Sequence, residues 1–219
     1  SPETTAAELP EVLAESLKSP KFNKQRVLKG MGFNPGADVF CAADIDKAVP
    51  ERPFFMFGDD GHTMLLNTAA LRYANIDKNT PDPTPGESYF VRDENGNPTG
   101  LVVEIEAMLY VRANVPELQN LYNAAGIKAS VKNLTRYGFT TAFDAATCQA
   151  DSKVMEVLRK MDSRHALNIR CHTSFIYAGE EALPLEDVME ALKEQRAKFS
   201  SERLIPDTLK MIADGTVEN

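Results

Sequence analysis

The carboxyl-terminal half of the chain alternates segments of strand character with segments of helix character. Strand-like runs at 139–145, 167–177 and 208–213 are separated by helix-like runs at 151–161 and 184–200. Such alternation is typical of βα units, whose parallel strands form one sheet. A parallel sheet is normally covered on both faces, and a closed eight-stranded barrel needs roughly 250 residues. Three strands therefore predict only part of such a barrel.

The residues before this half have a different texture, in which short strands and turns dominate. The run Asp93-Glu94-Asn95-Gly96-Asn97-Pro98 separates β-rich segments at 88–92 and 99–104. Asn-Gly between two such segments is a strong hairpin signal. Further strands are predicted at 26–31 and 54–57. The spacing of apolar residues predicts helices over 5–18, 42–49, 67–73 and 118–134.

Composition narrows the range of partners. The formal net charge is −8, and nucleic-acid binding relies on clustered Lys and Arg, so we expect no nucleic-acid partner. No apolar run approaches the roughly 20 residues that cross a bilayer, so we expect no membrane partner. The cysteines Cys41, Cys148 and Cys171 are far apart and odd in number, which argues against a disulfide framework. A reducing compartment is the simpler reading, and we expect a cytoplasmic protein.

Five motifs follow one another along the chain. They are Gly30-Met31-Gly32-Phe33; Pro50-Glu51-Arg52-Pro53-Phe54-Phe55 with Asp60-Gly61-His62 and Asn67-Thr68-Ala69-Ala70-Leu71; Arg92-Asp93-Glu94-Asn95-Gly96-Asn97-Pro98-Thr99-Gly100; Gly138-Phe139-Thr140-Thr141-Ala142-Phe143-Asp144-Ala145; and Leu209-Lys210-Met211-Ile212-Ala213-Asp214-Gly215. Each motif alone is weak, but the ordered set is specific. It resembles the amidohydrolase superfamily, in the branch of enzymes similar to N-substituted formamide deformylase.

The resemblance implies a metal-dependent hydrolase with a (β/α)8 TIM-like barrel and a flanking β-sandwich. Segments 139–145, 168–176 and 209–213 would be barrel strands two, three and four. The fold class is then α/β, a partial barrel of strands 2–4 with an inserted lobe. Its parts would be a barrel-associated helix in 1–19, an inserted α+β lobe with the hairpin in 20–115, and the partial βα barrel segment in 116–219.

The sequence departs from the family pattern at the metal ligands. The family has a His-x-His pair on strand one, a lysine on strand four, and two histidines and an aspartate on later strands. Here the histidines are His62, His165 and His172, and no two form His-x-His. A hydrolytic site needs three or four ligands and an open position for water. We therefore expect an internal fragment that is inactive alone. A divalent metal such as zinc would bind the intact enzyme, and none would bind this chain.

Lys210 matches the lysine of strand four, which in the family can react with carbon dioxide to form a carbamate that bridges two metals. A lysine amine must be neutral to react, and burial favours its neutral form. An ordinary strand lysine is the structural alternative, but the context Lys-Met-Ile-Ala-Asp-Gly favours the ligand. Asp214 is expected to orient this ligand from a neighbouring position. Turn formation with Gly215 is its structural alternative.

His62 is the candidate catalytic residue of the lobe. In the functional interpretation the lobe covers the barrel mouth and His62 meets the substrate; in the structural one it is a turn residue after Asp-Gly. His172 alternates with Cys171 on one strand, so only one of them faces the barrel axis, and we expect a hydrogen-bonded histidine there. His165 is expected in a solvated loop. Asp144 ends a strand, at the rim where barrel active sites are built.

The main hypothesis is a fragment of an amidohydrolase that hydrolyses a C–N bond in a small amide- or formamide-like substrate, where cations activate water and polarise the carbonyl oxygen. The alternative is a non-catalytic binding or regulatory protein derived from the same fold. A third class, an unrelated α/β hydrolase, lacks support because the sequence has neither a Gly-x-Ser-x-Gly elbow nor a P-loop. A partial barrel exposes strand edges, so we also expect self-association.

Overall fold

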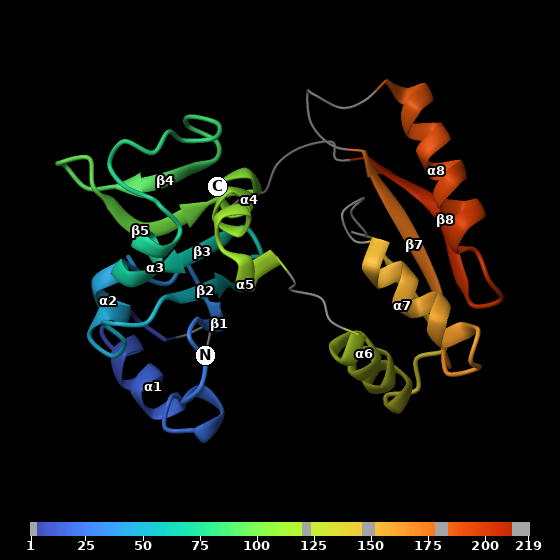
Figure 1. Cartoon of the computed structure of the whole chain (residues 1–219), viewed down its shortest axis with the longest axis horizontal. Helices are drawn as coiled ribbons and strands as arrows, with labels where there is room; N and C mark the ends of the chain where they lie inside the picture. The colour runs from blue at the N-terminus through green and yellow to red at the C-terminus, as the bar shows by residue number, and fades with distance from the viewer. Residues whose placement is uncertain (1–3, 120–123, 146–151, 178–183, 212–219) are drawn as a thin grey trace. The chain divides into compact units, whose positions relative to one another are not determined.

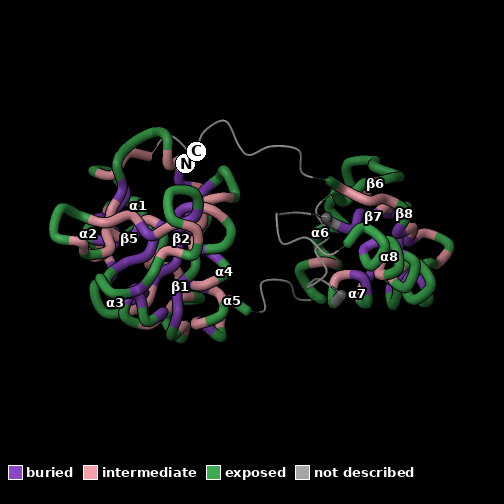
Figure 2. Tube along the Cα trace, turned by 90° about the horizontal axis from the view of Figure 1, so that it is seen from above, coloured by how far each residue is buried: buried purple, intermediate pink, exposed green. Residues whose placement is uncertain are grey.

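The computed structural model describes residues 4–119, 124–145, 152–177 and 184–211 (Figure 1). The chain divides into two compact units, Ser1–Leu121 and Tyr122–Asn219. Buried residues gather inside each unit, and exposed residues lie in the loops and on the outer sides of the helices (Figure 2). None of the helices in the described residues is long and apolar enough to cross a membrane.

The first unit contains a five-stranded mixed sheet in the order β1-β2-β3-β5-β4. The strands are β1 (Leu28–Phe33), β2 (Phe54–Gly58), β3 (Thr63–Leu66), β4 (Tyr89–Arg92) and β5 (Pro98–Val103). β1 is parallel to β2, and the other neighbours are antiparallel. The predicted hairpin is confirmed, because β4 and β5 pair on either side of Asn95-Gly96. This strand order is not that of a simple barrel.

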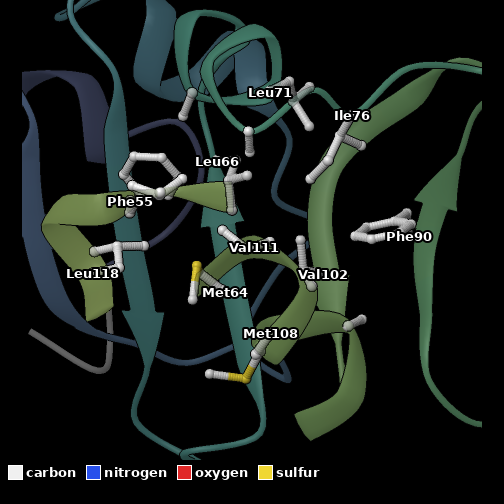
Figure 3. Close-up of a cluster of buried hydrophobic side chains, with 14 of the residues drawn as sticks. Phe55, Met64, Leu66, Leu71, Ile76, Phe90, Val102, Met108, Val111 and Leu118 are labelled. Atoms are coloured by element: carbon white, nitrogen blue, oxygen red, sulfur yellow. The ribbon is translucent and has the colours of Figure 1, made fainter. Parts of the chain in front are cut away.

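Helices cover both faces of this sheet. They are α1 (Leu9–Ser16), the 3-10 turn η1 (Pro20–Phe22), α2 (Ala42–Asp46), α3 (Thr68–Tyr73), α4 (Ile105–Asn114) and α5 (Pro116–Gln119). On one face Leu9 and Leu13 of α1 pack in the same cluster as Phe54 of β2. On the other face the side chains of α3, α4 and α5 pack against those of β2 and β3 (Figure 3). The sheet is therefore a buried central layer.

Asn67 joins the motif segments of this unit. Its side chain is fully buried, and its Oδ1 accepts hydrogen bonds from the backbone N–H of Phe54 at 3.0 Å and of Ala70 at 2.8 Å. Its Nδ2 donates to the carbonyl oxygens of Val49 at 2.6 Å and Arg52 at 2.9 Å. All four hydrogen bonds of the Asn67 side chain are thus made with backbone groups of α3, β2 and the loop before β2. The Asn of the motif is a structural residue.

The second unit contains a three-stranded parallel sheet in the order β6-β7-β8. Its strands are β6 (Thr141–Asp144), β7 (Arg170–Tyr177) and β8 (Leu204–Met211), and its helices are α6 (Ala124–Arg136), α7 (Ser152–Asp162) and α8 (Leu185–Phe199). Val131, Met155 and Cys171 share one apolar cluster, and Phe175 and Val188 share another. The predicted α/β class and the alternation of strands with helices are confirmed in this unit.

One predicted helix is wrong. Instead of a single helix over 118–134, the structure has α5 and α6, and residues 120–123 between them lie outside the described part. Leu118 packs in the core of the first unit, whereas Val131 packs in the core of the second. The shared apolar spacing therefore belonged to two helices with different cores.

Two elements were not predicted, and one strand begins earlier than expected. All positions of β3 are buried, so the strand shows no alternation of buried and exposed residues. In α4 the apolar residues Ile105 and Leu109 are exposed, while Ala107 and Val111 are buried. Neither element therefore has a clear polar face. β8 begins at Leu204, four residues before its predicted start at 208. Pro206 lies inside it beside a register shift, a place where a sheet tolerates proline.

Candidate functional site

His62 lies in the tight turn that joins β2 to β3. Asp60 holds this turn, because its Oδ1 accepts hydrogen bonds from the backbone N–H of His62 at 3.0 Å and from the N–H and hydroxyl of Thr63 at 3.1 and 2.9 Å. Gly61 has φ +74°, a left-handed conformation that glycine adopts without a steric cost. The Asp-Gly-His motif is therefore a turn that presents the histidine at one end of the sheet.

Glu104 is the partner of His62. Its Oε2 lies 2.8 Å from His62 Nδ1, and its backbone N–H donates to the His62 carbonyl oxygen at 2.8 Å. The two residues meet because Thr63 and Val103, their chain neighbours, are partners in the antiparallel pair β3–β5. The side chains of His62 and Glu104 are 33% and 21% exposed, so the pair is reachable from solvent.

Sequence reasoning missed Glu104. A predicted strand at 63–66, paired with the second strand of the hairpin, would have indicated Glu104, because that register brings residue 62 beside residue 104. The four buried residues of β3 carry no period-2 pattern, so this signal was absent from the sequence.

The sheet of the second unit has two different faces. Cys171 belongs to the apolar cluster shared with the helices, and burial, with the negative charges of Asp144 and Asp162, raises the pKa of its thiol to about 11. Because side chains alternate along a strand, His172 lies on the face opposite the helices. Its Nδ1 is 3.2 Å from Oδ2 of Asp207, which occupies the register shift of β8. His172 is a hydrogen-bonded histidine, as expected, and His165 is exposed in a turn.

Lys210 lies on the same helix-free face as His172. Leu209 beside it packs against the cluster of α8, so alternation directs Lys210 to the other face. The side chain is half-buried, and Lys210 pairs with Ile176 near the carboxyl end of β8. Active sites of parallel α/β sheets form at this end of the strands. Asp144 ends β6 at the same edge, whereas Asp214 lies outside the described residues.

The predicted site residues are divided between the two units. His62 belongs to the first unit and Lys210 to the second. Within the described residues no three His, Cys, Asp or Glu side chains are grouped so that they would hold a metal ion. A cleft of about 230 Å³ lies between α1 and β1, but its lining is mostly apolar and includes neither His62 nor Glu104. Within the described residues, the predicted ligand position Lys210 is therefore not accompanied by a group of His, Cys, Asp or Glu side chains that would hold a metal ion.

Two curated proteins are similar to this chain over different lengths. The chain is 29% identical over 203 residues to the exoenzymes regulatory protein AepA of Pectobacterium carotovorum, covering 89% of this chain and 42% of that protein. It is 38% identical over 66 residues to the N-substituted formamide deformylase of Arthrobacter pascens, covering 30% of this chain and 12% of the enzyme. The chain spans less than half the length of these curated relatives.

A solved structure shares the fold. It is that of an uncharacterized metal-dependent hydrolase from Pyrococcus furiosus, with a TM-score of 0.57, 18% sequence identity, and coverage of 98% of this chain and 40% of that one. At this identity the similarity concerns the fold alone. The sequence model of the amidohydrolase family matches residues 4–219, which is nearly the whole chain. The chain therefore belongs to the amidohydrolase family.

Proposed function

We propose that this chain is part of a metal-dependent amidohydrolase that hydrolyses the C–N bond of a small amide- or formamide-like molecule. The observation that carries the proposal is the position of Lys210, half-buried on the helix-free face at the carboxyl end of β8. The sheet β6-β7-β8 would be strands two to four of a (β/α)8 barrel, and its helix-free face would line the barrel interior. Residues 20–115 of the first unit would be the inserted lobe, and residues 1–19 would hold the barrel-associated helix.

Lys210 would hold one position of the metal site, and Asp214 would orient it. A bound divalent cation such as zinc would supply polarisation of the carbonyl group and a more acidic water molecule. His62 would act on the substrate from the lobe. Because the chain spans 42% or less of the length of its relatives, we propose that the remaining ligands belong to a longer protein and that this chain alone is inactive. Cys41 and Cys171 are free thiols, which fits a cytoplasmic protein.

The test uses the longer parent protein with the single change Lys210→Ala. Hydrolysis of a panel of N-substituted formamides and simple amides is measured together with the metal content of the purified protein. We expect Lys210→Ala to lose both activity and bound metal, and added acetate to restore part of both, because a carboxylate can replace a carbamate. The matched control is Lys193→Ala, which removes an exposed lysine from α8. A Lys210→Ala protein that folds and keeps wild-type metal content and activity would refute the proposal.

A second candidate function rests on the name of a relative. AepA is described as a regulatory protein, and it aligns with most of this chain. A regulatory or binding protein on the same fold needs no complete metal site. It would show no hydrolysis of the substrate panel in the longer parent, and Lys210→Ala would leave its metal content unchanged. The experiment above therefore separates the two functions.

A further inference from the structure

The backbone of Glu104 has a conformation that is sterically unfavourable for a residue with a side chain. Its φ is 68° and its ψ is 165°, a region that is essentially reserved for glycine. The backbone of Glu104 connects β5 to α4, donates to the His62 carbonyl oxygen and accepts from the N–H of Met108, and a glycine would do the same without strain. Strain of this kind persists where the surrounding structure enforces it, and it is frequent at functional sites. The carboxylate of Glu104 is the part that a glycine would not supply.

That carboxylate is directed to one atom of the candidate catalytic histidine. The backbone N–H of Glu104 is bonded to the His62 carbonyl oxygen, and its Oε2 is 2.8 Å from His62 Nδ1. The first bond fixes the two backbones relative to each other, and the second fixes the imidazole ring. Asp60 holds the His62 backbone from the other side of the turn. The ring is therefore held by its Nδ1 edge and by its own main chain.

A carboxylate accepts hydrogen bonds and donates none, so the ring nitrogen that faces it carries the proton. In a neutral imidazole this leaves the lone pair on Nε2, and we find no partner for Nε2 among the described residues. We propose that Glu104 is a positioning residue that fixes the Nδ1–H tautomer of His62, so that Nε2 accepts a hydrogen bond or a proton from a bound donor such as a substrate amide N–H or a water molecule.

The catalytic part of this inference rests on the proposed function. When water attacks the carbonyl carbon, its O–H bond breaks and the proton forms a bond to Nε2. The ring then carries N–H groups on both nitrogens, and the adjacent Glu104 carboxylate stabilises its positive charge. As the C–N bond breaks, the proton leaves Nε2 and bonds to the departing nitrogen. His62 thus begins and ends as the same neutral tautomer.

His172 and Asp207 provide a matched pair for comparison. They also join an imidazole Nδ1 to a carboxylate, at 3.2 Å, on the sheet of the other unit. His172 pairs with Ile205 near the amino-terminal end of the strands, the end that serves stability in βα barrels. Changes at Asp207 should therefore alter His172 and leave His62 unaltered.

The test is spectroscopic and uses this chain. Its three histidines give separate signals in long-range ¹H–¹⁵N correlation spectra, which distinguish a protonated ring nitrogen from one with a lone pair. Spectra are recorded in alkaline buffer, where imidazole rings are neutral. We expect His62 to carry its proton on Nδ1. Glu104→Gln should shift His62 toward a mixture of tautomers, because an amide can donate as well as accept, and Asp207→Asn should change only His172. A proton on Nε2 of His62, or a His62 spectrum unchanged by Glu104→Gln, overturns the inference.

Kinetics of the longer parent test the catalytic part separately. We expect Glu104→Gln to lower kcat about 10- to 100-fold with little change in KM, as outer-shell partners of catalytic groups do, and Asp207→Asn to leave both unchanged. If the spectra behave as expected but His62→Gln retains its kcat, the tautomer assignment stands and the catalytic role of His62 is refuted. If the parent hydrolyses nothing, the proposed function fails while the spectra still decide the role of Glu104.

Discussion

Replacing Asn67 by alanine should destabilise the first unit more than any conservative surface change. The variant loses the side-chain cap of α3, which is worth about 1 kcal/mol. It also leaves the N–H of Phe54 and the carbonyl oxygen of Val49 without their partners in a buried environment. Each such orphaned group costs roughly 1–3 kcal/mol. These contributions add to about 3–7 kcal/mol, and single changes above about 5 kcal/mol are exceptional, so we expect a loss of about 3–5 kcal/mol in the free energy of unfolding.

The assay is equilibrium unfolding in urea, followed by the NMR signals of the histidines. His62 reports on the first unit and His172 on the second, so the effect can be assigned to one unit. With a urea slope of about 2 kcal/mol per molar, the His62 midpoint should fall by roughly 2 M. Asn23→Ala removes an exposed asparagine and should change stability by less than about 0.5 kcal/mol.

Asn67→Asp refines this test. The aspartate keeps the shape and still accepts from Phe54 and Ala70, but it cannot donate to the carbonyl oxygens of Val49 and Arg52. We expect it to be at least as destabilising as Asn67→Ala. The reasoning is refuted if Asn67→Asp is as stable as the wild type, or if Asn67→Ala moves the His62 midpoint no more than Asn23→Ala does.

Four further expectations follow from the same structure. Gly100 has φ +104°, and a Cβ there would collide with the backbone of β3, so Gly100→Ala should lower the free energy of unfolding in urea by about 3 kcal/mol or more. Gly96 has φ +79° and open space around it, so Gly96→Ala should lower it by about 1 kcal/mol. Equal losses for the two variants would contradict this expectation. The pKa of Cys171 is raised to about 11, so its contribution to stability is complete below pH 9 and is lost as pH rises toward 11. Between pH 8 and pH 10 the free energy of unfolding should fall by about 1.4 kcal/mol more in the wild type than in Cys171→Ala. Parallel pH profiles of the two proteins would refute this role of Cys171. Glu104→Gly should raise the His62 urea midpoint, because it relieves about 1–3 kcal/mol of backbone strain and loses the hydrogen bond to the neutral His62 ring, which is worth about 1 kcal/mol. A lowered midpoint would show that the strain is overestimated. Phe143 is 56% exposed on the helix-free face, so we expect the chain to associate with a second copy. Sedimentation velocity should show weaker association for Phe143→Glu than for the wild type. A wild type that is monomeric at every concentration would refute this expectation.

The sequence was most informative where the signal is local. Asn95-Gly96 predicted the hairpin because turn residues impose a local backbone geometry: Gly96 is left-handed, with φ +79°, and its N–H donates to the Asp93 carbonyl oxygen in the loop between β4 and β5. In the second unit the strands and two of the three helices were predicted separately, whereas α6 was predicted as part of one longer helix and β8 begins four residues before its predicted start. Lys210 was placed on a strand by its motif, and its face follows from the packing of Leu209 in the structure. The hairpin and the alternation of strands with helices needed no knowledge of distant contacts.

The sequence was least informative where the structure depends on pairing between distant segments. β3 and α4 have no polar face, so no pattern marked them, and without β3 nothing places residue 104 beside residue 62. The positive φ of Glu104 has no sequence signal either, since a glycine is the residue that such a conformation predicts. The residue of the candidate site that sequence reasoning missed is thus Glu104, which has a backbone conformation that is unusual for its residue type.

That disagreement separates two kinds of residue within the first unit. Asn67 and Gly100 agree with their surroundings at every level: the buried amide bonds four backbone groups, and the glycine occupies a place where no side chain fits. Glu104 disagrees with its own backbone and is held in place by its contacts with His62. A residue of the first kind is explained by the folding of the lobe. A residue of the second kind is expected to lower stability while it fixes an imidazole ring, and the proposed chemistry at Nε2 of His62 would account for that combination.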